Sequence, residues 1–119
     1  MTLIQIAKLS LFAFLLAGGQ ILFKKTALGL ADTSGLANAG QLLVSKWFMA
    51  ALVLYGAATV LWVMILREIP LARAYPFTAL GFILVPTAGV LMFGEKLGAG
   101  YIFGVVLIIA GLGFIARGN

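Results

Sequence analysis

Long uncharged apolar stretches dominate the chain. Three of them contain 20 residues each and no charged side chain, at 47–66, 74–93 and 97–116. A fourth, residues 9–23, reaches spanning length if it begins near Leu3 and Lys8 extends toward the membrane surface. A helix of about 20 apolar residues is long enough to cross a bilayer. Because the bilayer core holds no water, the backbone N–H and C=O groups of a span must hydrogen-bond to one another, as they do in a helix. The pattern predicts an all-α integral membrane bundle of four transmembrane helices, at about 3–23, 47–66, 74–93 and 97–116.

Composition agrees with this interpretation. The chain has 119 residues, is 64% hydrophobic and has a mean hydropathy of +1.20, far from a soluble domain. No linker suggests a second unit, so residues 1–119 are expected to form a single four-helix transmembrane domain. The sequence contains no cysteine and no histidine, which removes disulfides and most transition-metal sites, and no cofactor or metal is expected. The first stretch is interpreted as a retained span, because no secreted domain follows it.

The basic residues are spread over the span ends. The net charge is +5, but its eight cations do not form one patch, so no nucleic-acid partner is expected. Most of them are interpreted as headgroup anchors, and the others as contacts to anionic phospholipid or a phosphate-bearing substrate. The N-terminal side holds Lys8, Arg67, Arg73 and Arg117, and the other side holds Lys24, Lys25, Lys46 and Lys96. This balance gives no orientation from the positive-inside rule.

The connection between the first two spans is the longest. Within residues 24–46, Asp32-Thr33-Ser34 offers capping oxygens, and leucine and alanine then recur at helical spacing from Leu36. A short amphipathic helix on the membrane surface, or an early start of the second span, is predicted there.

Small and polar residues form a stripe along the first span, at spacings of three and four that place them on one helix face. They are Ser10, Ala13, Ala17, Gln20 and Lys24. Gly18 and Gly19 beside the stripe permit close approach of another helix. Helix packing and a cavity wall are both consistent with this stripe.

The second and third spans carry polar residues as well. Tyr55, Thr59 and Trp62 share one face of the second span, which is interpreted as a pocket-facing stripe or as packing. The third span opens with Arg73, Tyr75 and Pro76, followed one turn later by Thr78. Pro86 leaves a carbonyl of the preceding turn without its donor, which predicts a kink near Phe82.

The fourth span carries glycines on one face. Gly100 and Gly104 are four residues apart, and Gly111 follows seven residues later. Such gaps favour close helix association. We expect a dimer interface on this face, formed by Gly100, Gly104, Leu107, Ile108 and Gly111. Packing within the four-helix unit is the alternative.

Several of these segments resemble the drug/metabolite transporter superfamily. They are the four-span order, Ile69-Pro70-Leu71-Ala72-Arg73-Ala74-Tyr75-Pro76, Gly94-Glu95-Lys96-Leu97 and the glycine-spaced fourth span. One branch, the small multidrug resistance proteins, implies antiparallel homodimers that exchange protons for cations at a glutamate in the middle of span one. This chain has Leu15-Leu16-Ala17-Gly18 there, and its three acidic residues, Asp32, Glu68 and Glu95, are all in predicted loops.

A second branch is more similar. Leu15 to Gln20, then Lys24, and Ala74-Tyr75-Pro76 resemble the EamA-like subunits proposed to flip aminoarabinose-phospho-undecaprenol. The resemblance implies a multi-pass flippase subunit in the bacterial inner membrane, not an enzyme. It would move a polyprenyl-phosphate-linked sugar and pair with a like copy or with a related four-span subunit. In that family, one subunit type carries a basic residue where Arg73 stands.

The residue chemistry agrees with a lipid-linked phosphate. Such a substrate needs cations near headgroup depth and a polar seam for its sugar, while its tail stays in lipid. The candidate substrate-binding residues are Gln20, Lys24, Tyr55, Thr59, Trp62, Arg73, Tyr75 and Thr78. Two alternatives remain: an exporter of small cationic solutes, and a non-transporting assembly partner of a membrane glycosyltransferase.

Overall fold

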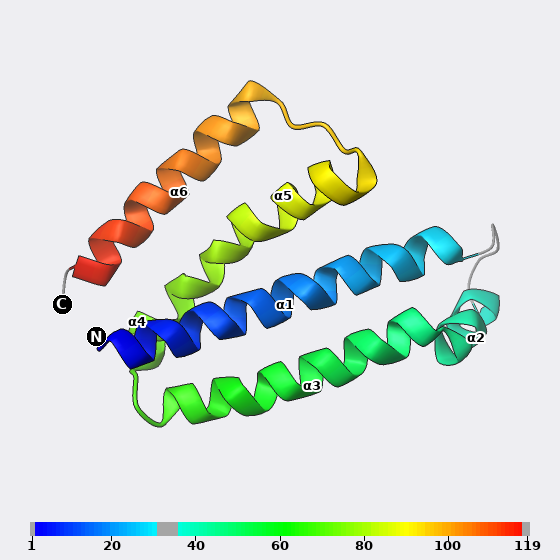
Figure 1. The fold of residues 1–119 in the computed structure, drawn as a ribbon, viewed down its shortest axis with the longest axis horizontal. Helices are drawn as coiled ribbons and strands as arrows, with labels where there is room; N and C mark the ends of the chain where they lie inside the picture. Colours follow the sequence, from blue (N-terminus) through cyan, green and yellow to red (C-terminus); the bar gives the residue numbers. More distant parts are fainter. Residues whose placement is uncertain (1, 31–35, 118–119) are drawn as a thin grey trace.

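Four long apolar helices make up the protein (Figure 1). The structure is a computed structural model and describes residues 2–30 and 36–117. The spans are α1 (Leu3–Gly29), α3 (Lys46–Leu66), a broken third span (Leu71–Phe93) and α6 (Ala99–Arg117). All four are long and apolar enough to cross a membrane, which confirms the predicted all-α, multi-pass membrane fold. The first helix is longer than expected, because it continues past Phe23 to Gly29.

Side chains and glycine define several helix ends. Thr2 and Gln5 form a capping box at the start of α1, each side chain bonding the other's backbone at 3.2 Å. The Ser45 hydroxyl accepts from the backbone N–H of Phe48 at the start of α3. Gly94 ends the third span with φ of 67°, a left-handed conformation that glycine adopts without strain. These ends place the loops beyond the apolar stretches.

The third span is not one regular helix. It consists of α4 (Leu71–Ala74), the 3₁₀ segment η1 (Tyr75–Leu80) and α5 (Gly81–Phe93). The Thr78 hydroxyl donates to the carbonyl of Tyr75 at 2.7 Å within η1. The sequence predicted a kink near Phe82 from Pro86, whereas the irregular segment precedes Phe82 and Pro86 lies inside α5. A 3₁₀ stretch within a span is a place where a helix changes direction easily.

The predicted short helix in the first connection is α2 (Leu36–Val44). The proposed caps at Asp32, Thr33 and Ser34 lie outside the described residues. At the start of α3, Lys25 and Lys46 lie over the ring of Trp47, at 4.5 and 5.2 Å from its centroid. These cation–π contacts hold two lysines at this end of the bundle.

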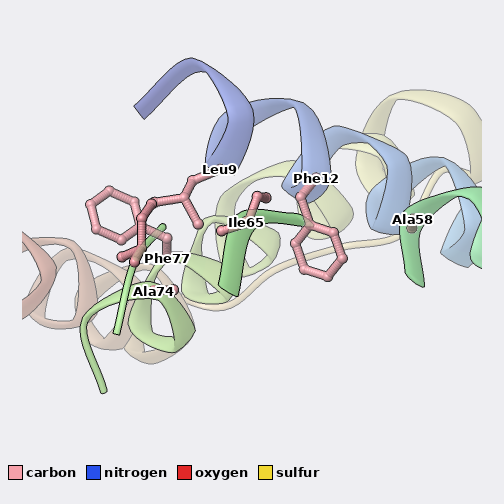
Figure 2. Packing of buried hydrophobic residues seen from close by; sticks show 7 residues of the cluster. Leu9, Phe12, Ala58, Ile65, Ala74 and Phe77 are labelled. Atoms are coloured by element: carbon pink, nitrogen blue, oxygen red, sulfur yellow. The ribbon is translucent and has the colours of Figure 1, made fainter. Parts of the chain in front are cut away.

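The buried core lies at one end of the bundle. Helix α1 runs between α3 and α5 (Figure 1). Near its N-terminus it packs against α3, α4 and η1 through a cluster shown in Figure 2, which includes Leu9, Phe12, Ile65, Ala74 and Phe77. An ion pair of 2.5 Å between Lys8 and Glu68 joins α1 to the α3–α4 turn at the same end. The buried cluster therefore joins α1, α3, α4 and η1 in this half of the bundle.

Helix α6 stands apart from α1 and α3 (Figure 1). Its principal contacts are with η1, and none of its residues is buried. A Cβ added at Gly100, Gly104 or Gly111 would meet no atom within 4 Å. The glycine gaps of the fourth span are thus not filled by the chain's own helices.

Candidate substrate site

Two neighbouring cavities open on the half of the bundle away from the buried core. The first, of about 340 Å³, is bounded by α1, α3, η1, α5 and the start of α6. Gln20, Tyr55, Thr78 and Tyr101 give it polar groups from four different elements. Small and apolar residues form the remaining wall, among them Ala13, Ala17, Gly81, Phe82 and Val85. A cavity with a few polar groups on an apolar wall is the usual form of a small-molecule site.

The close approach of α1 and α3 positions the polar groups of this cavity. Gly19 faces Tyr55 so closely that a Cβ at Gly19 would overlap the tyrosine ring, and a Cβ at Gly18 would lie 3.0 Å from the Leu54 side chain. This confirms the predicted role of the glycine pair. The Gln20 amide donates to the Tyr55 hydroxyl at 2.5 Å. The ring of Tyr55 also stacks on Phe23, with centroids 5.1 Å apart, so its orientation is held from two sides.

The second cavity continues toward the end of α1 that carries Lys24. It measures about 320 Å³ and shares Gln20 and Val85 with the first. Lys24 and Glu95 line it and form an ion pair of 3.4 Å between α1 and the α5–α6 loop. Both side chains are nearly half exposed, at 43% and 46%. The two cavities adjoin at Gln20 and Val85, so the Lys24–Glu95 pair lies next to the polar groups of the first cavity.

Glycine brings the Glu95 carboxylate to the rim. The left-handed Gly94 turns the chain back after α5, and the backbone N–H of Glu95 donates to the carbonyl of Gly89 at 3.1 Å. The Glu95 side chain crosses Gly89, where a Cβ would overlap its carboxylate oxygen. A carboxylate so held lies beside the polar stripe of α1.

The structure brings together only part of the predicted site. Gln20, Tyr55 and Thr78 share the first cavity, and Lys24 lines the second. Ala13 and Ala17 of the polar stripe line the first cavity, which favours the cavity-wall interpretation over packing alone. The other predicted residues lie outside these two cavities: Thr59, Trp62, Arg73 and Tyr75.

The four outlying residues have different surroundings. The Thr59 hydroxyl donates to the carbonyl of Tyr55 in its own helix at 2.8 Å. Trp62 stacks on Phe12 at 4.6 Å and meets Tyr75 edge-on at 6.3 Å, so both aromatics lie beside the buried cluster. Arg73 is partly exposed in α4, at the opposite end of α1 from Lys24.

Sequence reasoning did not identify Glu95 or Tyr101 as site residues. Glu95 was recognised only as part of a family-like segment, and Tyr101 stood among apolar residues. The glycine after Phe93 signals a helix end. No local pattern reports that the following carboxylate returns to α1, because Lys24 and Glu95 are far apart in the sequence. Among the described residues, no three Asp or Glu side chains gather closely enough to hold a metal ion.

Comparison with known families supports a transport fold. The model of the Small Multidrug Resistance protein family matches residues 30–108. The chain belongs to this family. The match covers α2, α3, the broken third span and part of α6, and it leaves out all of α1. This family member therefore departs from the multidrug pattern in the helix where a membrane carboxylate would be expected, since α1 contains no acidic residue.

Curated relatives carry a different function in their names. The chain is 39% identical over 66 residues to the probable 4-amino-4-deoxy-L-arabinose-phosphoundecaprenol flippase subunit ArnE of Salmonella enteritidis PT4, which covers 56% of this chain and 60% of the relative. The proteins of the same name from Pectobacterium atrosepticum and Yersinia pseudotuberculosis serotype O:1b are 35% and 37% identical, over 56% and 59% of this chain and 58% and 61% of theirs. The chain thus spans about 60% of the relatives' length. No solved structure matches it.

Proposed function

We propose that this protein is a flippase subunit that moves a polyprenyl-phosphate-linked sugar across the bacterial inner membrane. The observation that carries the proposal is a pair of adjoining cavities that share Gln20, one lined by Lys24 and the other by Tyr55 and Thr78, in a chain whose spans hold no acidic residue. A cation at headgroup depth suits a phosphate, and hydroxyl and amide groups suit a sugar. The flippase subunits among the relatives support the same class of substrate.

The two cavities would bind different parts of the substrate. The phosphate rests at Lys24, the sugar enters the first cavity beside Gln20, and the polyprenyl tail stays in lipid. Four small helices then need to enclose only a headgroup. Gln20 and Tyr55 bond each other and line the first cavity with Thr78, whereas an assembly partner of another enzyme would be expected to direct them toward that enzyme.

Arg73 offers a second phosphate position on the opposite side. The core around Leu9 and Phe77 closes that side in the structure, and η1 lies between Arg73 and the first cavity. A change in η1 would connect the first cavity to Arg73, because η1 contributes both Thr78 to the cavity and Phe77 to the core.

The proposal predicts protein-dependent flipping in vesicles. Purified protein is reconstituted with a polyprenyl-phosphate-linked amino sugar, and a membrane-impermeant amine reagent is added outside. Without flipping, the reagent modifies only the outer-leaflet fraction. With the protein present, we expect modification to continue beyond that fraction, because inner-leaflet lipid reaches the outer surface. Modification that stops at the outer-leaflet fraction in protein-containing vesicles would contradict the function of this chain as a flippase by itself.

The family match favours export of small cations as the second candidate function. That activity needs a titratable group in the membrane to exchange for the cation, and all three acidic residues of this chain lie outside the spans. We therefore expect no proton release when a quaternary ammonium compound is added to purified protein in detergent. Release of about one proton per bound cation would favour the exporter.

We also propose that the protein works as a dimer, with a second copy or with a related four-span subunit. Helix α6 is apolar and has no buried residue, and its glycine face is open. In a bilayer, glycine gaps allow a second helix to approach closely enough for favourable packing. The expected contact face contains Gly100, Gly104, Leu107, Ile108 and Gly111.

Gly111→Leu is expected to weaken this association. The leucine holds the two backbones apart, while its Cβ meets no atom of the same chain. Gly113→Leu is the matched control, because Gly113 is equally open but lies on the opposite face of α6. Native mass spectrometry in mild detergent measures the dimer fraction of each. A purely monomeric wild-type protein excludes the homodimer, and equal loss in both variants excludes this face.

A further inference from the structure

We propose that Lys24 and Glu95 form a binding site for a zwitterionic headgroup, in which Lys24 binds the phosphate and Glu95 binds a protonated amine on the sugar. The inference rests on the proposed function and narrows it to amine-bearing sugars. It assigns a role to Glu95, a residue of the α5–α6 loop, and makes it the group that distinguishes a charged sugar from a neutral one.

The position of the carboxylate supports this role. Glu95 lines the second cavity together with Lys24 and Gln20, so an acid, a base and an amide converge on one space. Gly89 and the left-handed Gly94 are the features that let the carboxylate lie there. A phosphate that contacts Lys24 would bring the attached sugar within reach of Gln20 and Glu95.

The ion pair itself suits an exchange of partners. Lys24 and Glu95 are 3.4 Å apart, and each is nearly half exposed. Such a pair contributes little to stability, because water screens it and long side chains lose freedom when they pair. When a headgroup with a phosphate and an ammonium binds, the phosphate takes the place of Glu95 beside Lys24, and the ammonium takes the place of Lys24 beside Glu95. No charge is left unpaired, and the new contacts are charge-assisted hydrogen bonds.

A headgroup with a neutral sugar has the phosphate but no ammonium to pair with Glu95. Its phosphate would draw Lys24 away from Glu95 and leave the carboxylate beside an uncharged ring. The phosphate and the carboxylate would then repel each other across the same cavity. The site should therefore favour an amine-bearing headgroup over one whose amine is acylated.

The chain contains a matched control for this pair. Lys8 and Glu68 also join α1 to a loop, with comparable exposed fractions of 37% and 45%. They line a separate cavity of about 250 Å³ with Met64 and Arg67, and neither residue lines the two cavities around Gln20. Removing either ion pair costs one loop contact, but only Glu95 should affect headgroup selection.

The test is a binding titration of purified full-length protein in detergent with three lipids. They are a polyprenyl phosphate, the same lipid carrying a 4-amino sugar, and the same lipid carrying that sugar with its amine acetylated. Wild-type protein is expected to bind the amine form roughly tenfold more tightly than the acetylated form. Glu95→Gln should abolish this preference and retain binding of the bare lipid phosphate. Lys24→Gln should weaken all three lipids, and Glu68→Gln should change none.

Four outcomes would overturn the inference. If wild-type protein binds the amine and acetylated forms equally, or if Glu95→Gln keeps the preference, Glu95 does not select the amine and the flippase proposal stands. If wild-type protein binds none of the three lipids, the proposed function fails together with the inference. The double variant Lys24→Glu/Glu95→Lys restores an ion pair with its charges exchanged. Loss of all three lipids in Glu95→Gln, with recovery of binding in this double variant, would show that the pair only joins α1 to the loop.

Discussion

Gly81→Leu is expected to slow transport of the lipid-linked sugar by about 5- to 150-fold while the protein remains folded. Gly81 lines the first cavity, and a Cβ at this position meets no atom within 4 Å. The new side chain therefore occupies space that the sugar would need. Overlap with a bound group costs about 1–3 kcal/mol, which corresponds to this change in rate or affinity. The impermeant-reagent assay in vesicles measures the rate.

Two further variants separate blockage from damage. Gly81→Ala should retain most transport, because it adds one methyl group and stabilises a helix by about 0.5–1 kcal/mol. Gly113→Leu adds the same side chain outside both cavities and should transport normally. Melting temperatures in detergent confirm that all three variants fold. Normal transport by Gly81→Leu would mean that the headgroup does not pass through the first cavity.

Arg73→Ala is expected to weaken polyprenyl phosphate binding by about 5- to 150-fold. A guanidinium forms a bidentate pair with phosphate, and loss of such a contact costs about 1–3 kcal/mol. Arg73 lies in α4, at the start of the apolar third span, where we expect the headgroups of one leaflet. The affinity of Arg73→Lys should be intermediate, because an ammonium keeps the positive charge but cannot form the bidentate pair.

Arg117→Ala is the control for this series. Arg117 ends α6, whose C-terminal end lies on the same side of the bundle as α4 (Figure 1), so it is a cation at the end of a different span. Lipid-binding titrations of the three variants distinguish a binding residue from a membrane anchor. Equal losses for Arg73→Ala and Arg117→Ala would leave Arg73 with an anchoring role only.

The four spans could be predicted because the signal for them is local. An uncharged stretch such as 47–66 has to be helical in a bilayer wherever the rest of the chain lies. The ends of the helices were predicted less accurately. Helix α1 continues to Gly29, and the hydroxyl of Thr26, which donates to the Leu22 carbonyl, lies buried in this extension. The η1 segment was also not predicted, because the kink was expected from Pro86, whereas the 3₁₀ segment includes Pro76 and Pro86 lies inside α5.

The candidate site was predictable only in part, for a physical reason visible along α3. Tyr55, Thr59 and Trp62 lie on one face, so their spacing predicted one environment. The neighbours of that face change along its length. Near Gly19, α1 brings Gln20 to Tyr55 and leaves a cavity. Two turns further along α3, Phe12 of α1 covers Trp62. Periodicity reports which residues share a face, and it does not report what the face meets.

The sequence by itself determined the number of membrane helices, the position of the cations at their ends and the absence of acids from every span. Each of these depends on residues close together in the chain. Only the tertiary structure decided that Gln20, Tyr55 and Thr78 share one cavity, that Glu95 returns to Lys24, and that α6 leaves its glycines open. These features arise from contacts between distant segments, because the side chains that pack at each crossing set where helices touch and where space remains.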